Sequence, residues 1–375
     1  MHKLKVLYVQ PSCARGGVES VLLTLVRGCN RDKVEPHVIL LEHGSLVQEL
    51  RSAGVYTQVY PITHLRHIGN TLCTVARIAQ YIRRHRIDVV HCNGPKSQIY
   101  GALAATLAHV PNVYWLHDLP SPTLLTDTMG DLAFLLPATL RLANATETMS
   151  LASSHPFVRR APEILWYGID MDQYQERRYP MAVTSSAALS KRILLMGRIQ
   201  AWKGQHVLVR AAYHLKMRRR DVHIDIVGSP TLDADLAYDA SLRALVQDLD
   251  VADIVTFSPH TARPAVWYDK ADIVVHTSVR PEPFGLVLVE ALACGKPVVA
   301  TNMGGPIDIT DAGRVGGLLT PPDDPEALAE AILFLLDHPD KARHLAEAGQ
   351  QRVRARYGAE RMVANLQAVY ERIVA

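Results

Sequence analysis

The amino-acid sequence predicts two α/β domains, each a doubly wound parallel β-sheet covered by helices on both faces. Short runs rich in valine and isoleucine alternate with longer segments, such as residues 71–86, whose apolar residues recur at helical spacing. The short runs are apolar throughout, which is typical of parallel strands buried on both faces. In the first half these runs are residues 5–10, 36–42, 57–62, 88–93 and 112–118. The pattern restarts at residue 191, with runs at 191–198, 223–229, 253–258, 272–278 and 297–302. This restart predicts a second domain of the same class.

The pattern breaks between residues 177 and 191, where small residues dominate and no periodicity is visible. We therefore predict a linker there, an N-terminal domain over residues 1–180 and a C-terminal domain over residues 181–357. The last segment, residues 358–375, is predicted to be an amphipathic helix. Its apolar face carries Met362, Leu366, Val369 and Ile373. Ligands of doubly wound sheets bind beyond the carboxyl ends of the strands, so we expect the chemistry in a cleft between the two domains.

Composition and charge exclude several classes of protein. The 375 residues suit two domains of ordinary size, and a hydrophobic content of 48% is typical of globular proteins. A net charge of +3 is too small to imply nucleic-acid binding, so we expect no nucleic acid partner. The five cysteines form no C-x-x-C pair and no cluster with zinc spacing, which indicates free thiols in a reducing compartment.

The chain shows no membrane-spanning pattern. Its start, M-H-K-L-K-V-L-Y-V-Q, is basic and then apolar, but the apolar run is too short for a signal peptide. No run approaches the ~20 apolar residues of a spanning helix. We expect a cytoplasmic protein, either free in solution or peripheral at the inner face of a membrane. The basic run R-R-H-R at residues 83–86 closes a predicted helix; it either complements the helix dipole in solvent or contacts an anionic membrane or acceptor.

The stretch at residues 280–302, R-P-E-P-F-G-L-V-L-V-E-A-L-A-C-G-K-P-V-V-A-T-N, is almost wholly apolar yet carries Glu282 and Glu290. A helix is predicted to begin near Gly285 and to end at Cys294. Its first backbone amides have no intrahelical partner and attract anions. The residues that present these amides are Phe284, Gly285 and Leu286.

The two glutamates suit hydroxyl-rich ligands, because a carboxylate only accepts hydrogen bonds and can accept them from both hydroxyls of a diol. With Glu282 on a sugar, Glu290 on a ribose and the amides on phosphate, the stretch predicts a nucleotide-sugar site. The simpler alternative is that Glu282 only favours the helix dipole and that Glu290 is a solvated surface residue.

Two further loops carry charge or glycine at predicted helix starts. The segment G-R-I-Q-A-W-K-G, residues 197–204, places Arg198 and Lys203 at an exposed strand-to-helix turn, where they can bind a diphosphate or be merely solvated. The segment P-S-C-A-R-G-G-V-E-S opens a helix at Gly16 and Gly17, another terminus suited to anions. Because it is not G-x-G-x-x-G, it argues against a dehydrogenase. Glu19 is either functional or a partner of the helix dipole.

The segment E-P-F-G-L-V-L-V-E-A-L-A-C-G-K-P-V-V-A-T resembles the E-x7-E signature of the retaining GT-B glycosyltransferases of family 4. The resemblance extends over nearly the whole chain and is better in the second half. It implies the GT-B fold, in which two Rossmann-like domains flank an interdomain cleft and the final helix crosses back onto the first domain. It also implies that Arg198 and Lys203 bind the donor's diphosphate and stabilise it as it leaves. The loop at Gly16 and Gly17 is similar to the family's G-G-x-E loop, which approaches the diphosphate from the first domain.

His117 and Asp118 end the predicted strand N-V-Y-W-L-H-D. In the resembled family a His followed by Asp lies here, near the reacting sugar, although a lone His is more often structural. Asn93 and Lys96, after the preceding strand, are weaker candidates for contacts with the acceptor. One departure concerns W-Y-G-I-D, in which Tyr167 replaces the Asn of the family's P-N-G-[VI]-D. Another is His260, which stands where the family commonly has Gly.

These observations predict a glycosyltransferase that moves a sugar from a nucleotide-diphosphate donor to an acceptor hydroxyl, with retention of the α configuration. The acceptor is a small molecule, a glycan or a lipid-linked molecule. The catalytic residues expected are His117, Arg198, Lys203 and Glu282. No D-x-D motif stands where a diphosphate-bound metal would need it, so we expect neither a metal nor a cofactor. The alternatives are a sugar-nucleotide 2-epimerase of the same architecture and a non-catalytic nucleotide-sugar-binding protein. The base, the sugar and the acceptor are not specified by the sequence.

Overall fold

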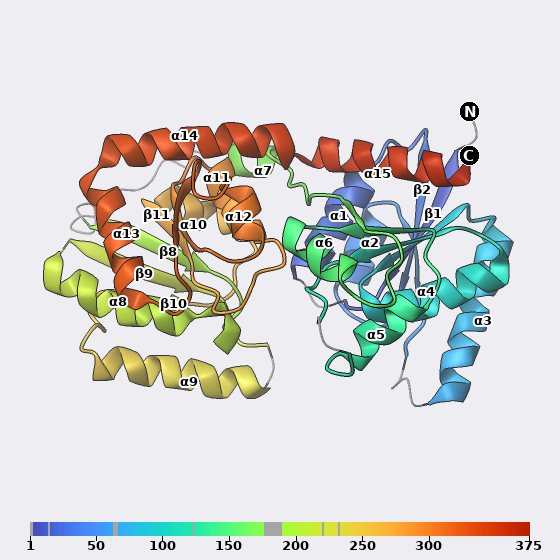
Figure 1. The fold of residues 1–375 in the computed structure, drawn as a ribbon, viewed down its shortest axis with the longest axis horizontal. Coiled ribbons are helices and arrows are strands. Elements are labelled where there is room, and N and C mark those ends of the chain that lie inside the picture. Colours follow the sequence, from blue (N-terminus) through green and yellow to red (C-terminus); the bar gives the residue numbers. More distant parts are fainter. Residues whose placement is uncertain are drawn as a thin grey trace. The chain divides into compact units, whose positions relative to one another are not determined.

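A computed structural model of the chain (Figure 1) describes residues 3–13, 16–62, 67–121, 124–175, 190–219, 221–231 and 233–375. The chain divides into two compact units. Unit 1 comprises Met1–Ile169 and Gly358–Ala375, and unit 2 comprises Asp170–Tyr357. The first unit therefore ends earlier than the predicted boundary at residue 180. That boundary, and the predicted linker apart from its last two residues, lie outside the described residues.

Among the described residues, unit 1 contains a seven-stranded parallel sheet in the order β3-β2-β1-β4-β5-β6-β7. The strands are β1 (Leu4–Gln10), β2 (Val34–Leu40), β3 (Tyr56–Val59), β4 (Val89–Asn93), β5 (Asn112–Leu116), β6 (Leu140–Ala143) and β7 (Glu163–Ile164). The first five occupy the predicted apolar runs with small shifts at their ends. β6 and β7 were not predicted, because neither LRLA nor EI is a run rich in valine and isoleucine. The order reverses at β1 and β4, as in doubly wound sheets.

Helices cover both faces of this sheet. They are α1 (Gly17–Gly28), α2 (Leu46–Ser52), α3 (Ile68–His85), α4 (Pro95–Ala108), α5 (Thr128–Leu135), α6 (Thr146–Ser153) and the C-terminal α15 (Ala359–Val374). Helices α3, α4 and α5 bury side chains in one core cluster with β1, β2, β4 and β5. Helix α15 packs against α1, and its Tyr370 hydroxyl lies 2.8 Å from Nδ1 of His91 in β4. The last helix is thus part of unit 1.

Among the described residues, unit 2 contains a six-stranded parallel sheet in the order β10-β9-β8-β11-β12-β13. Its strands are β8 (Lys191–Met196), β9 (Val222–Val227), β10 (Val255–Ser258), β11 (Ile273–His276), β12 (Val298–Thr301) and β13 (Gly317–Thr320). Its helices are α7 (Asp172–Gln175), the 3-10 turn η2 (Ala201–Lys203), α8 (Gln205–Arg218), α9 (Asp233–Asp248), α10 (Pro264–Lys270), α11 (Leu286–Ala293), α12 (Gly305–Ile309), α13 (Pro325–Asp337) and α14 (Pro339–Arg356). Only β13 was not predicted as a strand.

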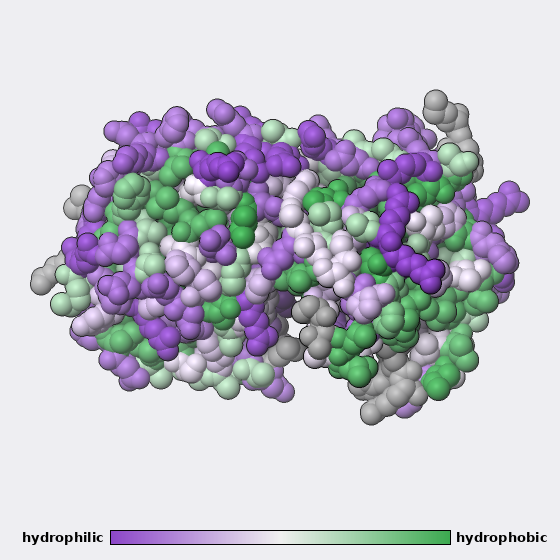
Figure 2. Space-filling model, viewed as in Figure 1, coloured by the Kyte–Doolittle hydropathy of each residue, from purple (hydrophilic) through white to green (hydrophobic). Residues whose placement is uncertain are grey.

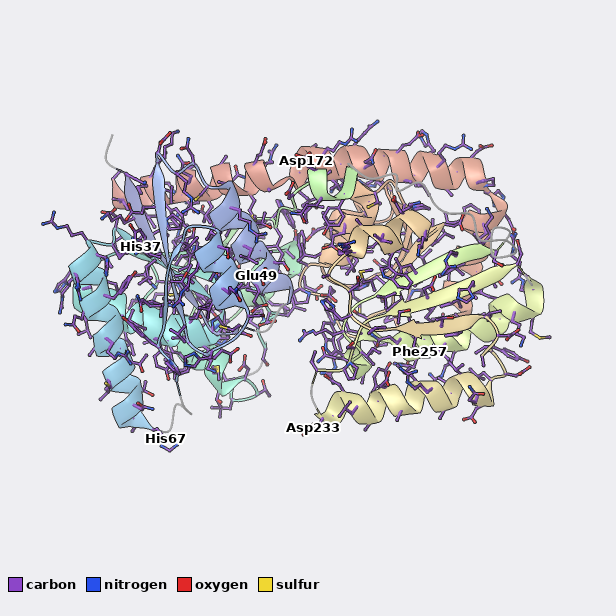
Figure 3. The ribbon with its side chains drawn as sticks, turned by 180° about the vertical axis from the view of Figure 1, so that it is seen from behind. His37, Glu49, His67, Asp172, Asp233 and Phe257 are labelled. Atoms are coloured by element: carbon purple, nitrogen blue, oxygen red, sulfur yellow. The ribbon has the colours of Figure 1, made fainter. Side chains whose placement is uncertain are left out.

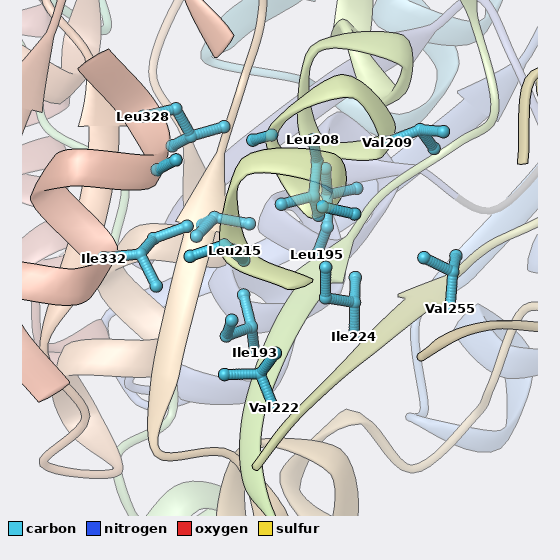
Figure 4. Packing of buried hydrophobic residues seen from close by; sticks show 14 of the residues in the cluster. Ile193, Leu195, Leu208, Val209, Leu215, Val222, Ile224, Val255, Leu328 and Ile332 are labelled. Carbon is cyan, nitrogen blue, oxygen red and sulfur yellow. The ribbon is translucent and has the colours of Figure 1, made fainter. Parts of the chain in front are cut away.

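The core of unit 2 lies between its sheet and the helices α8 and α13 (Figure 4). Ile193 of β8, Leu208 of α8 and Ile332 of α13 are fully buried there. Figure 3 marks Asp172, where α7 begins, and Phe257 of β10. Helix α7 packs on α11, which explains why the chain already belongs to unit 2 at Asp170. Within the described residues, no helix has the length and apolar character needed to cross a membrane.

Candidate functional site

Two loops meet at the carboxyl ends of the neighbouring strands β8 and β11 in unit 2. The Val279 amide donates to the Trp202 carbonyl (2.8 Å), and the Thr277 hydroxyl donates to the Lys203 carbonyl (3.0 Å). Gly204 separates η2 from α8 at a φ of 70°, and a Cβ there would lie 1.9 Å from the Thr277 carbonyl oxygen. The turn therefore needs glycine. Parallel pairing thus brings together two motifs that are far apart in the sequence.

The loop contact places Lys203 against Glu282. The Lys203 ammonium lies 2.6 Å from Oε2 of Glu282, and the two side chains are only 20% and 11% exposed. The same oxygen also has Nε2 of His276 at 3.2 Å and accepts from the Ser278 hydroxyl at 3.1 Å. The other carboxylate oxygen, Oε1, has no hydrogen-bond partner within the described ranges. Glu282 is thus held through one oxygen and can accept a further hydrogen bond through the other.

Glu282 is held in its charged form. Burial alone would raise the pKa of its carboxyl, but the Lys203 ammonium and the hydrogen bond from His276 outweigh burial and hold the pKa well below its usual range. The carboxylate is therefore ionised at neutral pH, beside a cation. The ion pair with Lys203 shows that Glu282 has a specific charged partner, in addition to any interaction with the helix dipole. His276 was not singled out from the sequence, because only the fold shows which strand-end residue faces Glu282.

Arg198 and Lys203 differ, although both belong to one motif. Arg198 is exposed, and its guanidinium has no hydrogen bond or ion pair with any described residue. Only its carbonyl is engaged, by Nε2 of Gln205 at 2.8 Å. Lys203 is largely buried and paired, so the prediction of an exposed turn is right for Arg198 and wrong for Lys203. The reason is the Glu282 carboxylate, which the sequence could not place beside it.

The helix at the motif E-P-F-G-L-V-L-V-E begins at Leu286 with Gly285 as its N-cap, one residue after the predicted start. Gly285 has a φ of 100°, a backbone conformation that residues other than glycine rarely adopt. The Phe284 ring is buried against Tyr357, so this side chain cannot contact a ligand. The Leu288 amide donates to the Gly285 carbonyl (3.0 Å), and a helix start leaves the amides of Leu286 and Val287 without an intrahelical partner.

A second glycine loop, not singled out from the sequence, supports Glu282 from the β12–α12 connection. The Gly305 amide donates to the Glu282 carbonyl (2.8 Å). A Cβ on Gly304 would lie 2.2 Å from that carbonyl oxygen, and one on Gly305 would lie 2.0 Å from the Phe284 carbonyl oxygen. The consecutive glycines in M-G-G-P were the only feature of the sequence that could have indicated this loop. They allow two backbones to approach closely enough to fix the loop that carries Glu282.

Glu290, on α11, is enclosed by two tyrosines. The Tyr268 hydroxyl donates to Oε2 of Glu290 at 2.7 Å, and the Tyr174 hydroxyl of α7 lies close enough to lower the pKa of this carboxyl. Burial raises the pKa of Glu290, and the two tyrosine hydrogen bonds oppose the rise. The alternative of a solvated surface residue is therefore wrong. Neither tyrosine was predicted, because α7 and α10 approach α11 only in the folded unit.

The predicted site residues of unit 1 form a hydrogen-bonded chain at the ends of β1, β4 and β5. Oε1 of Glu19 accepts from Nε2 of Gln10 (2.9 Å), whose Oε1 accepts from Nδ2 of Asn93 (2.9 Å). Oδ1 of Asn93 lies 3.1 Å from Nε2 of His117, whose Nδ1 is hydrogen-bonded to the Tyr167 hydroxyl. All five side chains are buried. The structure thus brings Asn93 and His117 together and links them to the first turn of α1.

His117 lies inside this chain, with 5% of its surface exposed. Burial holds the pKa of its imidazole well below the usual range, so the ring is neutral. Both ring nitrogens are engaged, and Tyr167, the residue that departs from the family's motif, occupies one of them. In this arrangement His117 can orient its neighbours, and a direct role at the reacting carbon stays a prediction.

The remaining predicted residues of unit 1 lie nearby. Gly16 is the N-cap of α1 and Gly17 its first residue; a Cβ on Gly16 would lie 2.9 Å from Oε2 of Glu19. Lys96 is the second residue of α4, and Asp118 is exposed directly after His117. A hollow of about 20 Å³ opens beside His117. Polar side chains in its lining include Asp118, Asp127, Asp131 and His155. This volume holds about one water molecule rather than a sugar.

Known families match most of the chain. A profile described as "Glycosyltransferase Family 4" matches residues 15–160, and one described as "Glycosyl transferases group 1" matches residues 183–352. The chain belongs to the family 4, group 1 glycosyltransferases. This glycosyltransferase is 30% identical to "D-inositol 3-phosphate glycosyltransferase" of Thermobispora bispora, over 89% of this chain and 82% of that protein. It is 24% identical to "Spore coat protein SA" of Bacillus subtilis, over 96% and 95% of the two chains.

Solved structures agree with the fold of this glycosyltransferase. Anabaena HepE, crystallised "in complex with UDP and glucose", is 26% identical to it and covers 98% of this chain and 99% of its own, with a TM-score of 0.86. The same Anabaena protein has also been crystallised in complex with UDP-glucose. The predicted GT-B class, two Rossmann-like α/β domains, is confirmed by these comparisons. Among the described residues, no group of three or more His, Cys, Asp or Glu side chains could hold a metal ion.

Proposed function

We propose that this glycosyltransferase moves a sugar from a UDP-sugar to an acceptor hydroxyl, with retention of the donor's α configuration and without a metal ion. The observation that carries the proposal is the meeting of the Arg198–Lys203 loop with the Glu282 loop at the carboxyl ends of β8 and β11. In doubly wound sheets this edge is where ligands bind. Uridine is favoured among the bases because the similar Anabaena protein was crystallised with UDP-glucose.

The donor's diphosphate fits the positive groups of this edge. The exposed Arg198 guanidinium can bind two phosphate oxygens at once, and Lys203 adds a point charge. The amides at the start of α11 are proposed as further donors. As the bond to the sugar breaks, negative charge grows on the leaving phosphate. Preorganised donors stabilise such a transition state by typically ~3–4 kcal/mol each.

Glu282 and Glu290 are proposed to bind hydroxyl groups of the donor. Glu282 has Oε1 available for a sugar hydroxyl, while its Oε2 is occupied by Lys203, His276 and Ser278. Because Lys203 neutralises Glu282, this carboxylate can lie near a diphosphate without strong repulsion. Glu290 is proposed to accept from the ribose hydroxyls, with Tyr268 and Tyr174 fixing its orientation.

The chemistry is proposed to follow same-face attack. The acceptor hydroxyl approaches the anomeric carbon on the side that the diphosphate leaves, and the departing phosphate oxygen takes the hydroxyl's proton. His117 is proposed to position this region rather than to act as base, since its ring is neutral and both nitrogens are engaged. Unit 1 is proposed to bind the acceptor, with Asn93, Lys96 and Asp118 as candidate contacts. The acceptor class is a hydroxyl-bearing small molecule, a glycan or a lipid-linked molecule.

A binding panel and a product analysis test the proposal. Among UDP-, GDP- and ADP-sugars, only UDP-sugars should raise the unfolding temperature. A ligand at 100 times its dissociation constant stabilises by ~2.7 kcal/mol. With an acceptor and excess chelator, NMR should show a product with an α-anomeric proton. A β product, or turnover that requires added magnesium or manganese, would contradict the stated mechanism. Conversion of the donor alone into a second sugar nucleotide would favour the epimerase alternative.

A further inference from the structure

A layer of aromatic side chains lies directly beneath the buried hydrogen-bonded chain at the strand ends of unit 1. In a strand, residues two apart point to the same face of the sheet. The residues two positions before the members of that chain on β1, β4 and β5 therefore form its floor, and they are Tyr8, His91 and Trp115. All three are buried. The ring of His91 lies 5.2 Å from that of Tyr8 and 5.5 Å from that of Trp115, measured between ring centroids.

The C-terminal helix α15 reaches this floor through one polar group. Hydrophilic residues cover much of the outer surface along this helix (Figure 2), while Tyr370 is among the side chains that it buries. The Tyr370 hydroxyl lies 2.8 Å from Nδ1 of His91 and donates to the Tyr8 hydroxyl at 3.3 Å. Its ring packs edge-on against His91, with the centroids 5.9 Å apart. The last helix thus holds the middle residue of the floor.

The hydroxyl of Tyr370 is not needed to fill space. A phenylalanine would bury nearly the same ring without removing a hydroxyl from water, which costs free energy unless hydrogen bonds replace those to water. What the hydroxyl supplies is a partner for Nδ1 of His91. Its loss would leave this buried nitrogen without a hydrogen bond to any described residue, and His91 would lose the contact that fixes its ring.

Trp115 connects His91 to the strand-end chain. Its ring contacts the ring of His117, with centroids 4.9 Å apart, as well as that of His91. It also packs edge-on against Tyr167 at 5.3 Å, and the Tyr167 hydroxyl is hydrogen-bonded to Nδ1 of His117. A displaced His91 ring would therefore move Trp115, and with it two of the groups that hold His117.

We propose that Tyr370 is a positioning residue for the acceptor side of the reaction. It acts through His91 and Trp115, and it keeps His117 in the orientation in which Nε2 faces Oδ1 of Asn93. Because a carbonyl oxygen only accepts hydrogen bonds, this orientation places the proton of the neutral ring on Nε2. The inference rests on the proposed function, in which unit 1 binds the acceptor. It adds the final helix of the chain to the residues that shape that side.

Tyr370→Phe tests the proposal, because it removes one hydroxyl and keeps the ring. In NMR spectra of the full chain with ¹⁵N-labelled histidines, the ring signals of His117 should shift and show both neutral tautomers. With UDP-glucose and one acceptor, kcat should fall about tenfold, while the dissociation constant for UDP should change less than twofold. Tyr100→Phe is the matched control. It removes a buried hydroxyl from the core on the opposite face of the sheet and should change neither kcat nor the His117 signals.

A second variant keeps the test decisive if Tyr370→Phe is poorly folded. His91→Gln removes the ring through which Tyr370 acts and should shift the His117 signals as well. When both changes are combined, kcat should fall no further than in the more impaired single variant, because the two residues act along one path. Fully additive losses would contradict that path.

The outcome that overturns the proposal is an unchanged His117 spectrum in folded Tyr370→Phe, even if its stability falls, because that would show a purely structural tyrosine. An equal shift in Tyr100→Phe, or a shifted spectrum with unaltered kcat, would overturn it too. Failure of the proposed function is a separate result, in which the unaltered chain forms no product from any UDP-sugar. The histidine spectra would then still decide whether Tyr370 holds His117.

Discussion

The strand ends of the two units are built from different chemistry. In unit 2, Lys203 and Glu282 form a charged pair beside an unpaired Arg198. In unit 1, the corresponding edge carries a buried chain that runs through Asn93 and His117 and relies largely on neutral groups. Both edges belong to parallel doubly wound sheets, so the fold alone does not explain the difference.

The contrast is consistent with the ligands proposed for the two edges. An exposed guanidinium and preorganised cations suit a diphosphate. The negative charge of the diphosphate must be neutralised when the ligand moves from water into the site. A hydrogen-bonded chain of mostly neutral side chains keeps the strand-end residues in fixed orientations with little electrostatic cost. Unit 2 should therefore respond to changes of charge, and unit 1 to the loss of single hydrogen bonds.

The largest effect is expected for Lys203→Met. Turnover should fall by about 10²–10³, because a cation is removed from the leaving phosphate. The free energy of unfolding should also fall by about 1–3 kcal/mol, because Glu282 loses the main partner of a largely buried carboxylate. Steady-state kinetics and urea unfolding check both. Normal stability together with normal turnover would show that the pair has no role.

The next largest effect is expected on the free energy of unfolding as the pH falls. Burial lowers the pKa of His91, in the unit 1 core, to about 3, whereas the unfolded chain takes up this proton near pH 6.5. Since the unfolded state then binds more protons, stability should fall as pH drops below about 6.5, by up to ~1.4 kcal/mol per unit for this group. His91→Gln should remove that much of the slope in urea unfolding measured across pH 7 to 5. An unchanged slope would contradict a neutral buried His91.

Tyr167→Phe should lower the stability of unit 1, because it removes a single hydrogen-bonding hydroxyl. It leaves Nδ1 of His117 and Nδ2 of Asn144 without the hydroxyl that both contact, at a cost of about 1–3 kcal/mol. Tyr213→Phe, at an exposed tyrosine of unit 2, is the matched control and should change nothing measurable. The free energies of unfolding of the two variants, measured at the same pH, check this prediction. Equal stability of the two variants would mean that the hydroxyl of Tyr167 does not hold His117.

Tyr174→Phe should give the smallest effect. Burial already raises the pKa of Glu290, and the Tyr174 hydroxyl lowers it, so removal of this hydroxyl should raise the pKa further and reduce the ionised fraction at a given pH. The dissociation constant for UDP should increase by a few-fold, about 1 kcal/mol, and recover toward the unaltered value at higher pH. Titration calorimetry at two pH values measures this. A pH-independent loss would point to packing rather than to ionisation.

The sequence was sufficient where structure is local. The apolar runs of β1, β8 and β11 and the helix at Leu286–Ala293 were predicted because their signals are continuous. The strands β6, β7 and β13 were missed because their sequences, LRLA, EI and GLLT, form no run rich in valine and isoleucine. Unit 2 begins at Asp170, before the predicted boundary at residue 180, because α7 packs on α11, a contact with no local signal.

The candidate site shows the same limit. Arg198 and Lys203 could be singled out because loops at strand ends carry ligands in this kind of sheet, and Glu282 and Glu290 because they are carboxylates in an apolar stretch. Their partners could not. His276 and Ser278 on Glu282, and the tyrosines on Glu290, depend on side-chain directions set by tertiary packing. The exposure expected for Lys203 failed for this reason, since Glu282 is 79 residues away in the sequence.

The central claim is that the β8–α8 loop of unit 2 binds the donor's diphosphate, and Arg198 tests it most directly. Its guanidinium has no partner among the described residues, so Arg198→Met should change the free energy of unfolding by no more than about 0.5 kcal/mol. Calorimetric titration with UDP should show a dissociation constant about tenfold or more above that of the unaltered chain, because a charge-assisted contact is lost. An equal dissociation constant in the folded variant would contradict the account.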